Sequence, residues 1–184
     1  MALIIEDGTM PKGSNAFVSV AEADAYLSAR NISTWPLPAS DLETDQNLAG
    51  KEAAIVRASD YLNTLTWRGA KTEWNWPMAW PRKEVFVPGA YDEYVPDDIV
   101  PEQVKRACIE LAALFYSGED LLAAVERGGR VASETVGPIS TSYFDDASNE
   151  TFYPAVAGLI GQFLAVIPGE AGGNHYTVMK AVPC

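Results

Sequence analysis

The chain has 184 residues, 48% of them hydrophobic, and a formal net charge of −12. This length predicts one domain whose hydrophobic core needs no metal or disulfide to fold. No apolar run approaches the roughly 20 residues that cross a bilayer, so we expect no membrane partner. The excess of acidic side chains opposes tight binding to duplex DNA, because such binding requires cations that displace counterions from phosphates.

Residues that carry out chemistry are sparse in this chain. The sole histidine, His175, lies in a glycine-rich segment that cannot hold a general base in place, and Cys108 lies in an apolar helical pattern typical of an inert core thiol. The sequence contains no zinc-binding pattern, no calcium-binding loop and no phosphate-binding loop. We therefore expect no enzyme activity, no cofactor and no metal.

The N-terminal part predicts an extended arm followed by a helix. Residues 1 to 18 contain glycine and proline that interrupt regular structure. The sequence from Ser19 to Glu22 is a capping box, so a helix should begin there and end near Asn31, with Ala23, Tyr26 and Leu27 on its apolar side. Residues 33 to 46 carry prolines and acidic residues without a clear period and are predicted to form a loop.

Two longer helices follow. The first runs from about Asn47 to Leu65, where the spacing of the apolar residues gives one buried face. We expect four charged side chains largely off that face: Lys51, Glu52, Arg57 and Asp60. The next helix begins at Pro101 and ends at Ser117-Gly118, with four residues on its buried face: Val104, Cys108, Leu111 and Phe115.

The C-terminal third mixes helices with one strand signal. A short helix is predicted from Asp120 to Arg127, and a final one from about Tyr153 to Ile167. Between them, Arg130 to Phe144 has β-branched, serine and aromatic residues on both sides of Gly137-Pro138, which predicts a β-hairpin. We therefore expect a mainly α fold, a small helical bundle with one protruding β-hairpin and extended N- and C-terminal arms. Residues 1–167 would form the domain and residues 168–184 the C-terminal arm.

The segment from Trp67 to Val100 lacks periodicity and is rich in tryptophan and proline. Aromatic and basic side chains alternate in it, as they do in stacking platforms for single-stranded nucleic acid. Candidate contacts for such a strand are Arg68, Trp74, Trp76 and Arg82. The alternative is that the tryptophans clamp a long loop onto the domain, with arginine stacked on their rings.

Several short motifs occur in a fixed order along most of the chain, although each is weak by itself. They are Ile5-Glu6-Asp7-Gly8, Asn15 to Tyr26, Ala58 to Leu62 with Trp67, Ala79-Trp80-Pro81-Arg82, Val100-Pro101 with Val104 to Ala107, and Ser133 to Ser140. Taken together, these motifs resemble a tailed-bacteriophage family of head-to-tail adaptor proteins. That family overlaps a group of phage proteins labelled as DnaT-like single-stranded-DNA-binding domains.

The resemblance implies a small helical adaptor that forms a ring of about twelve copies on the portal of the filled head. The partners it implies are the portal protein, the downstream neck or tail terminator/completion protein, and other copies of the chain. The resemblance also implies that genome DNA passes through the ring without tight binding. We then expect the protein to be made in the host cytoplasm and to end in the virion neck.

Subunit and partner contacts are expected from the hairpin and the C-terminal arm. The candidate residues are Val131, Thr135, Ile139, Thr141, Tyr143, Tyr176 and Met179. The runner-up function is a single-stranded-DNA-binding accessory protein of phage replication, which would use the aromatic and basic segment instead.

Overall fold

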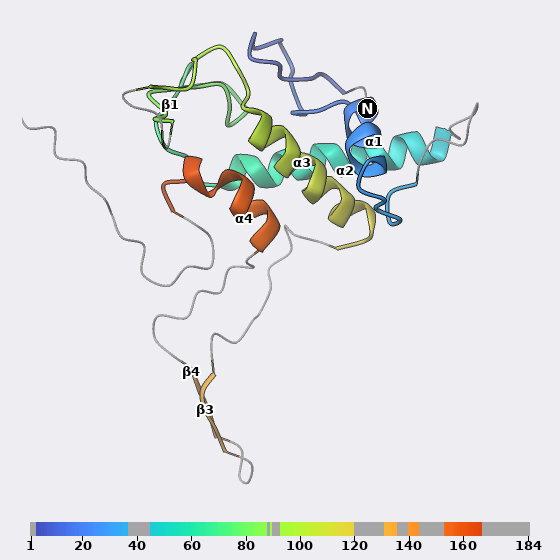
Figure 1. Ribbon diagram of the computed structural model, residues 1–184, viewed down its shortest axis with the longest axis vertical. Helices are drawn as coiled ribbons and strands as arrows, with labels where there is room; N and C mark the ends of the chain where they lie inside the picture. The colour runs from blue at the N-terminus through green and yellow to red at the C-terminus, as the bar shows by residue number, and fades with distance from the viewer. Residues whose placement is uncertain are drawn as a thin grey trace, which may run out of the picture. The chain divides into compact units, whose positions relative to one another are not determined.

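The computed structural model describes residues 3–36, 45–87, 89, 93–119, 131–135, 140–143 and 153–166. These residues are mostly helical, with two short pairs of antiparallel strands (Figure 1). Their elements are α1 (Val20–Ser28), α2 (Asp45–Thr64), β1 (Ala70–Lys71), β2 (Arg82–Lys83), α3 (Glu102–Tyr116), β3 (Val131–Thr135), β4 (Ser140–Tyr143), α4 (Pro154–Ile160) and the 3-10 turn η1 (Gly161–Phe163). The chain divides into a helical unit, Met1–Ala123 with Tyr153–Ala165, and a second unit, Ala124–Phe152 with Val166–Cys184.

Helix α3 is the centre of the helical unit, where it packs against α1, α2 and α4. The predicted buried face of α3 is confirmed, because Val104, Cys108 and Leu111 are fully buried and Phe115 nearly so. Full burial of an aliphatic side chain of this size contributes about 1.5–3 kcal/mol. The core of the protein therefore forms around the strongest helical pattern in the sequence.

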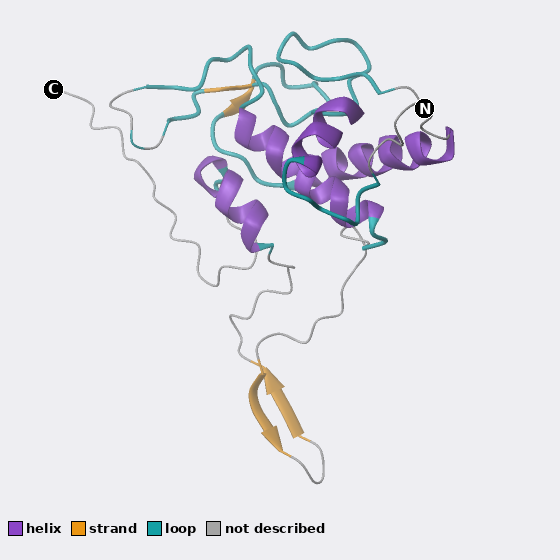
Figure 2. Cartoon of the chain, turned by 45° about the vertical axis from the view of Figure 1, so that its right-hand side comes forward, coloured by secondary structure: helices purple, strands orange, loops and turns teal. Residues whose placement is uncertain are grey.

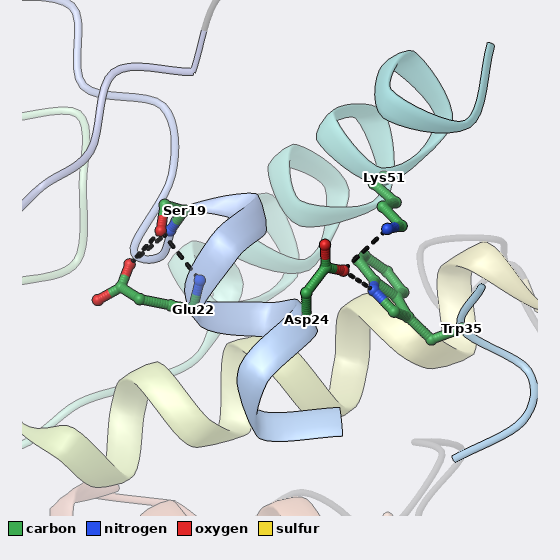
Figure 3. Close-up of polar contacts among 5 residues, drawn as sticks. All are labelled: Ser19, Glu22, Asp24, Trp35 and Lys51. Atoms are coloured by element: carbon green, nitrogen blue, oxygen red, sulfur yellow. Dashed lines mark hydrogen bonds and ion pairs between the residues drawn. The ribbon is translucent and has the colours of Figure 1, made fainter. Parts of the chain in front are cut away.

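The capping box at the start of α1 is confirmed. The Ser19 hydroxyl accepts a hydrogen bond from the backbone N–H of Glu22, and the Glu22 carboxylate accepts one from the backbone N–H of Ser19 (Figure 3). These two bonds satisfy N–H groups that a helix start leaves without partners. The helix ends at Ser28, slightly before the predicted end near Asn31.

Lys51 is buried, so the prediction that it lies off the buried face of α2 was wrong. Its Nζ lies 2.9 Å from Oδ1 of Asp24 in α1, and the same oxygen accepts a hydrogen bond from the indole of Trp35 (Figure 3). A buried ammonium is tolerated only when it is paired and hydrogen-bonded. The partners come from distant parts of the sequence, so the helical period of α2 alone could not predict this burial.

The N-terminal segment closes on itself, where the sequence predicted an extended arm. Ile5 and Ala16 form a parallel bridge, and the backbone N–H of Glu6 donates to the carbonyl of Ala16 at 2.8 Å. The end of this segment, including Phe17, is fully buried. Gly8, at φ +110°, packs so tightly that a Cβ there would lie 1.9 Å from the Asp98 carbonyl oxygen. This segment is therefore part of the helical unit.

The last helix is shorter than predicted. It ends at Ile160, and η1 follows it up to Phe163. Leu164 then leaves the helix to form an antiparallel bridge with Trp67, and the Ala165 N–H donates to the Thr66 carbonyl at 2.8 Å. Backbone pairing with a distant segment thus replaces the hydrogen bonds that would have continued the helix to Ile167, a residue outside the described ranges.

The predicted hairpin is present in the second unit as β3 and β4, drawn as orange arrows in Figure 2. Its pairs include Thr135 with Ser140 and Val131 with Tyr143, and the register shifts between Val131 and Ser133. The predicted Gly137-Pro138 turn, the short helix from 120 to 127 and the C-terminal arm from 168 to 184 lie outside the described residues.

Candidate functional site

The segment that joins α2 to α3 carries the candidate residues for single-stranded DNA, and its long irregular course is as predicted. Short backbone pairings organise it: β1 pairs with β2, and Val95 donates to the Val85 carbonyl at 2.8 Å. Gly69, at φ +67°, lies where a Cβ would stand 2.2 Å from the Lys83 carbonyl oxygen, so only glycine fits beside β2. The segment is therefore a loop with a conformation fixed by its own backbone contacts (Figure 2).

Arg82 points into this loop. Its side chain donates to backbone carbonyls of Arg68 at 2.8 Å, Gly69 at 2.9 Å, Ala79 at 3.1 Å and Trp67 at 3.4 Å. Only 8% of the residue is exposed, and burial lowers the pKa of the guanidinium. These bonds use the guanidinium to satisfy loop carbonyls, so in this conformation it is not offered to a phosphate.

Two of the loop's tryptophans belong to the core. The Trp80 ring packs edge-to-face against Trp67 and Phe163, with 5.7 Å between ring centroids in each pair. The Trp67 indole donates to the Leu62 carbonyl at 2.8 Å, whereas the Trp80 Nε1 has no hydrogen-bond partner among the described residues. These contacts fasten the loop to α2 and to η1, as the clamp interpretation predicted.

Trp76 fastens the loop to the N-terminal segment. Its Nε1 donates to Oε2 of Glu6 at 2.9 Å, and Glu6 is fully buried. The other carboxylate oxygen accepts hydrogen bonds from the backbone N–H groups of Gly8 at 2.9 Å and Met10 at 3.1 Å. A buried carboxylate is tolerated when hydrogen-bond donors surround it in this way.

Two other cations of the loop, Arg68 and Lys71, also bind backbone carbonyls, whereas Lys83 is exposed. Arg68 is exposed, and its Nε donates to the Leu164 carbonyl at 2.9 Å. Lys71 is partly buried, and its Nζ donates to the Trp76 carbonyl at 2.7 Å. Burial, with the charge of Arg82 nearby, lowers the pKa of Lys71. The basic side chains of the aromatic stretch therefore mainly hold the loop in shape.

Trp74 is the exception among the tryptophans of this loop. It is 91% exposed, and both of its sequence neighbours, Glu73 and Asn75, are exposed as well. Four residues were predicted as contacts for a single strand, and the structure does not bring them together as one exposed platform. Trp74 and Arg68 face solvent, Trp76 is half-buried and Arg82 is buried.

The predicted subunit contacts lie only partly in the described residues. Val131 and Thr135 are in β3, and Thr141 and Tyr143 are in β4. Ile139, Tyr176 and Met179 lie outside the described ranges. The role of these seven residues stays a prediction.

Cys108 is a core thiol, as its pattern predicted. Its Sγ lies 3.5 Å from the Ser59 hydroxyl, and burial raises the pKa of the thiol to about 12. Within the described ranges, no group of three or more His, Cys, Asp or Glu side chains is arranged to hold a metal ion. None of the helices in the described part of the chain is both long and apolar enough to span a membrane.

Comparison with known families gives one match, over residues 1–182, to a family described as "Putative DnaT-like ssDNA binding protein". The chain belongs to this DnaT-like family. No curated protein and no solved structure matches significantly. The description of the DnaT-like family agrees with the overlapping group named in the sequence analysis. It fits the runner-up function better than a neck adaptor.

Sequence reasoning missed two features of the site. Glu6 stands in the motif Ile5-Glu6-Asp7-Gly8, but its burial was not predicted, because a carboxylate next to Asp7 and Gly8 in a turn-rich segment is typical of a solvated loop. The burial of Arg82 did have a signal in Ala79-Trp80-Pro81-Arg82, one of the motifs that carry the resemblance. An arginine that closely follows a core tryptophan, in a loop without regular hydrogen bonds, is suited to satisfying the loop's carbonyls.

Proposed function

We propose that this protein is a structural head-to-tail adaptor of a tailed-phage virion, a ring subunit that joins the portal to the next neck or tail protein. The observation that carries this proposal is that Arg82 and Lys71 bind carbonyls of the loop with their charged groups. The exposed surface of the loop then presents the indole of Trp74 and the carboxylate of its neighbour Glu73. Such a surface suits contact with a protein better than contact with a phosphate backbone.

The hairpin supports the proposal because a pair of strands this short needs a partner to stabilise it. A two-stranded hairpin is marginally stable in water by itself, and β3 and β4 belong to the second unit of the chain. In the proposed ring, a neighbouring copy or the portal covers this hairpin or adds a strand to it. Adaptors of this kind need an element that reaches a neighbour, and the hairpin is our candidate for it.

The charge of the chain supports a role as a DNA conduit. A net charge of −12 repels phosphates and keeps a passing genome from adhering to the ring. In this proposal the protein reaches its partners through protein surfaces in the virion neck. The genome passes through the ring without tight binding.

A second candidate is a single-stranded-DNA-binding accessory protein of phage replication. The description of the family favours it, and so does the exposed ring of Trp74, which is available for stacking on a base. Arg68 is an exposed cation of the same loop that would accompany it. The arrangement of Arg82 and Lys71 is the observation that weighs against this candidate.

Two experiments separate the candidates. Negative-stain microscopy of purified phage particles with a gold-labelled antibody to this protein should show label at the neck if the protein is an adaptor. Particles without label would contradict the adaptor. Titration of a fluorescent single-stranded oligonucleotide at several salt concentrations tests the second candidate. That candidate requires salt-dependent binding that is lost in a Trp74→Ala, Arg68→Ala double variant. Arg82 is unsuited to this test, because its removal also disturbs the loop.

A further inference from the structure

The tip of the loop between α2 and α3, residues 72–79, presents one large aromatic side chain to solvent. Among the large hydrophobic side chains of the described residues, Trp74 is the most exposed, at 91%. A single exposed apolar residue needs no explanation by itself. Trp74 differs from such a residue because the backbone that carries it is fixed.

Hydrogen bonds brace this tip on both sides of Trp74. At its base, the Thr72 N–H donates to the Pro81 carbonyl at 3.3 Å and the Ala79 N–H donates to Oδ1 of Asn63 at 2.7 Å. Beside the indole, the Trp76 N–H donates to the Glu73 carbonyl at 3.1 Å. The Trp76 side chain is in turn held by Glu6.

This bracing gives Trp74 the properties of a binding anchor. A partner that buries the ring does not have to order the loop first, so binding does not carry the entropic cost of that ordering. Tryptophan is also the residue type most enriched among interface positions that dominate affinity. The tip is thus preorganised to place an indole in a pocket.

The charges at the tip indicate what kind of partner it fits. Glu73 is exposed on the tip, and Asp97 is exposed in a turn beside it, where the Thr72 hydroxyl donates to the Asp97 carbonyl at 3.0 Å. The nearby cations, Lys71 and Arg82, already bind loop carbonyls. The charged side chain of the tip itself is Glu73, whose exposed carboxylate neighbours Trp74 in the sequence. This pattern disfavours a nucleic acid and favours a partner surface that carries lysine or arginine.

We propose that Trp74 is the anchor by which this protein docks on a neighbouring protein of the particle. The indole enters an apolar pocket of that partner, and lysine or arginine side chains on the rim of the pocket pair with Glu73. The inference rests on the proposed adaptor function and identifies the chemistry of one of its partners.

Competition for incorporation into particles tests the proposal. Tagged protein is produced during infection together with the untagged wild type, and mass spectrometry measures the ratio of the two in washed particles. Trp74→Ala should lower this ratio at least about tenfold relative to tagged wild type. Glu73→Lys should lower it more than Glu73→Gln, because reversal of the charge repels a basic rim. Tyr94→Ala, which removes another exposed aromatic ring, is the matched control and should be incorporated normally.

The outcomes separate this inference from the function on which it rests. If tagged wild type is absent from washed particles, the adaptor function fails. If wild type is incorporated and Trp74→Ala is incorporated equally well, the anchor fails and the adaptor function stands. Urea unfolding of each variant checks its fold, and we expect Trp74→Ala to be as stable as wild type because its side chain is exposed.

Photo-cross-linking identifies the molecule that contacts the tip of the loop. Protein with p-benzoylphenylalanine in place of Trp74 is incorporated into particles and irradiated. An adduct to another protein, with lysine or arginine beside the linked residue, supports the proposal. Adducts to DNA, or only to another copy of this chain, would overturn it.

Discussion

The indole Nε1 of Trp76 lies 2.9 Å from Oε2 of Glu6, and this contact joins the N-terminal segment to the loop between α2 and α3. The remaining oxygen of Glu6 binds two backbone N–H groups of its own segment, those of Gly8 and Met10. One buried carboxylate thus fixes two irregular segments at once. The braced surface that carries Trp74 depends on this contact.

We predict that Glu6→Gln lowers the free energy of unfolding by about 1–3 kcal/mol, because the amide NH₂ meets N–H donors where the carboxylate oxygen accepted from them. Urea unfolding followed by circular dichroism measures this change. The control is Glu73→Gln, which alters an exposed carboxylate and should leave stability within about 0.5 kcal/mol of wild type. Equal stability of the two variants would show that Glu6 does not brace the loop.

The buried pair of Lys51 and Asp24 gives a second prediction. Lys51→Met leaves the Asp24 carboxylate without its cation and should cost about 3–5 kcal/mol of stability. The double variant Lys51→Met, Asp24→Leu should lose less than the sum of the two single variants, because neither charge then remains unpaired. Additive losses in a double-mutant cycle would contradict the pairing.

Arg82 and Arg68 are predicted to respond differently to the same change. Arg82→Met removes hydrogen bonds to four carbonyls and should lower the free energy of unfolding by several kcal/mol, about 2–5. Arg68→Met removes one bond to the Leu164 carbonyl, from an exposed residue, and should cost about 1 kcal/mol. Thermal and urea unfolding compare them. A fully stable Arg82→Met protein would mean that the guanidinium is free for a ligand.

The Cys108 thiol predicts how stability depends on pH. Burial raises its pKa from 9.0 to about 12, so the folded protein favours the neutral thiol. The contribution of this thiol to the free energy of unfolding is fully present below about pH 9. It falls by about 1.4 kcal/mol per pH unit as the pH rises toward 12. Unfolding of wild type and Cys108→Ala at several pH values above 8 measures the difference. Parallel pH profiles for the two proteins would contradict the prediction.

The helices could be predicted because their signals are local. The capping box at Ser19 and the apolar repeat from Val104 to Phe115 each fix an element through residues close in sequence. The strands of the hairpin were predictable for the same reason, from β-branched residues around a turn signal. Burial of the α3 face then follows from its period of 3.6 residues.

The candidate site could be predicted only in part, because distant partners determine it. Whether a tryptophan of the loop is buried depends on α2, α4 and the N-terminal segment, and the sequence of the loop does not encode those contacts. Trp67, Trp80 and the exposed Trp74 look alike in sequence. The early end of α4 has the same origin, since Leu164 pairs with the distant Trp67.

The central claim is that this protein is a stoichiometric part of the particle neck, and its copy number tests that claim most directly. Quantitative mass spectrometry of washed particles, with the portal protein of the same particles as internal standard, measures the ratio of the two chains. An adaptor ring built on the portal predicts about one copy per portal subunit. Absence of the protein from washed particles, although infected cells contain it in abundance, would contradict the claim. Binding of the purified protein to a single-stranded oligonucleotide would then support the second candidate.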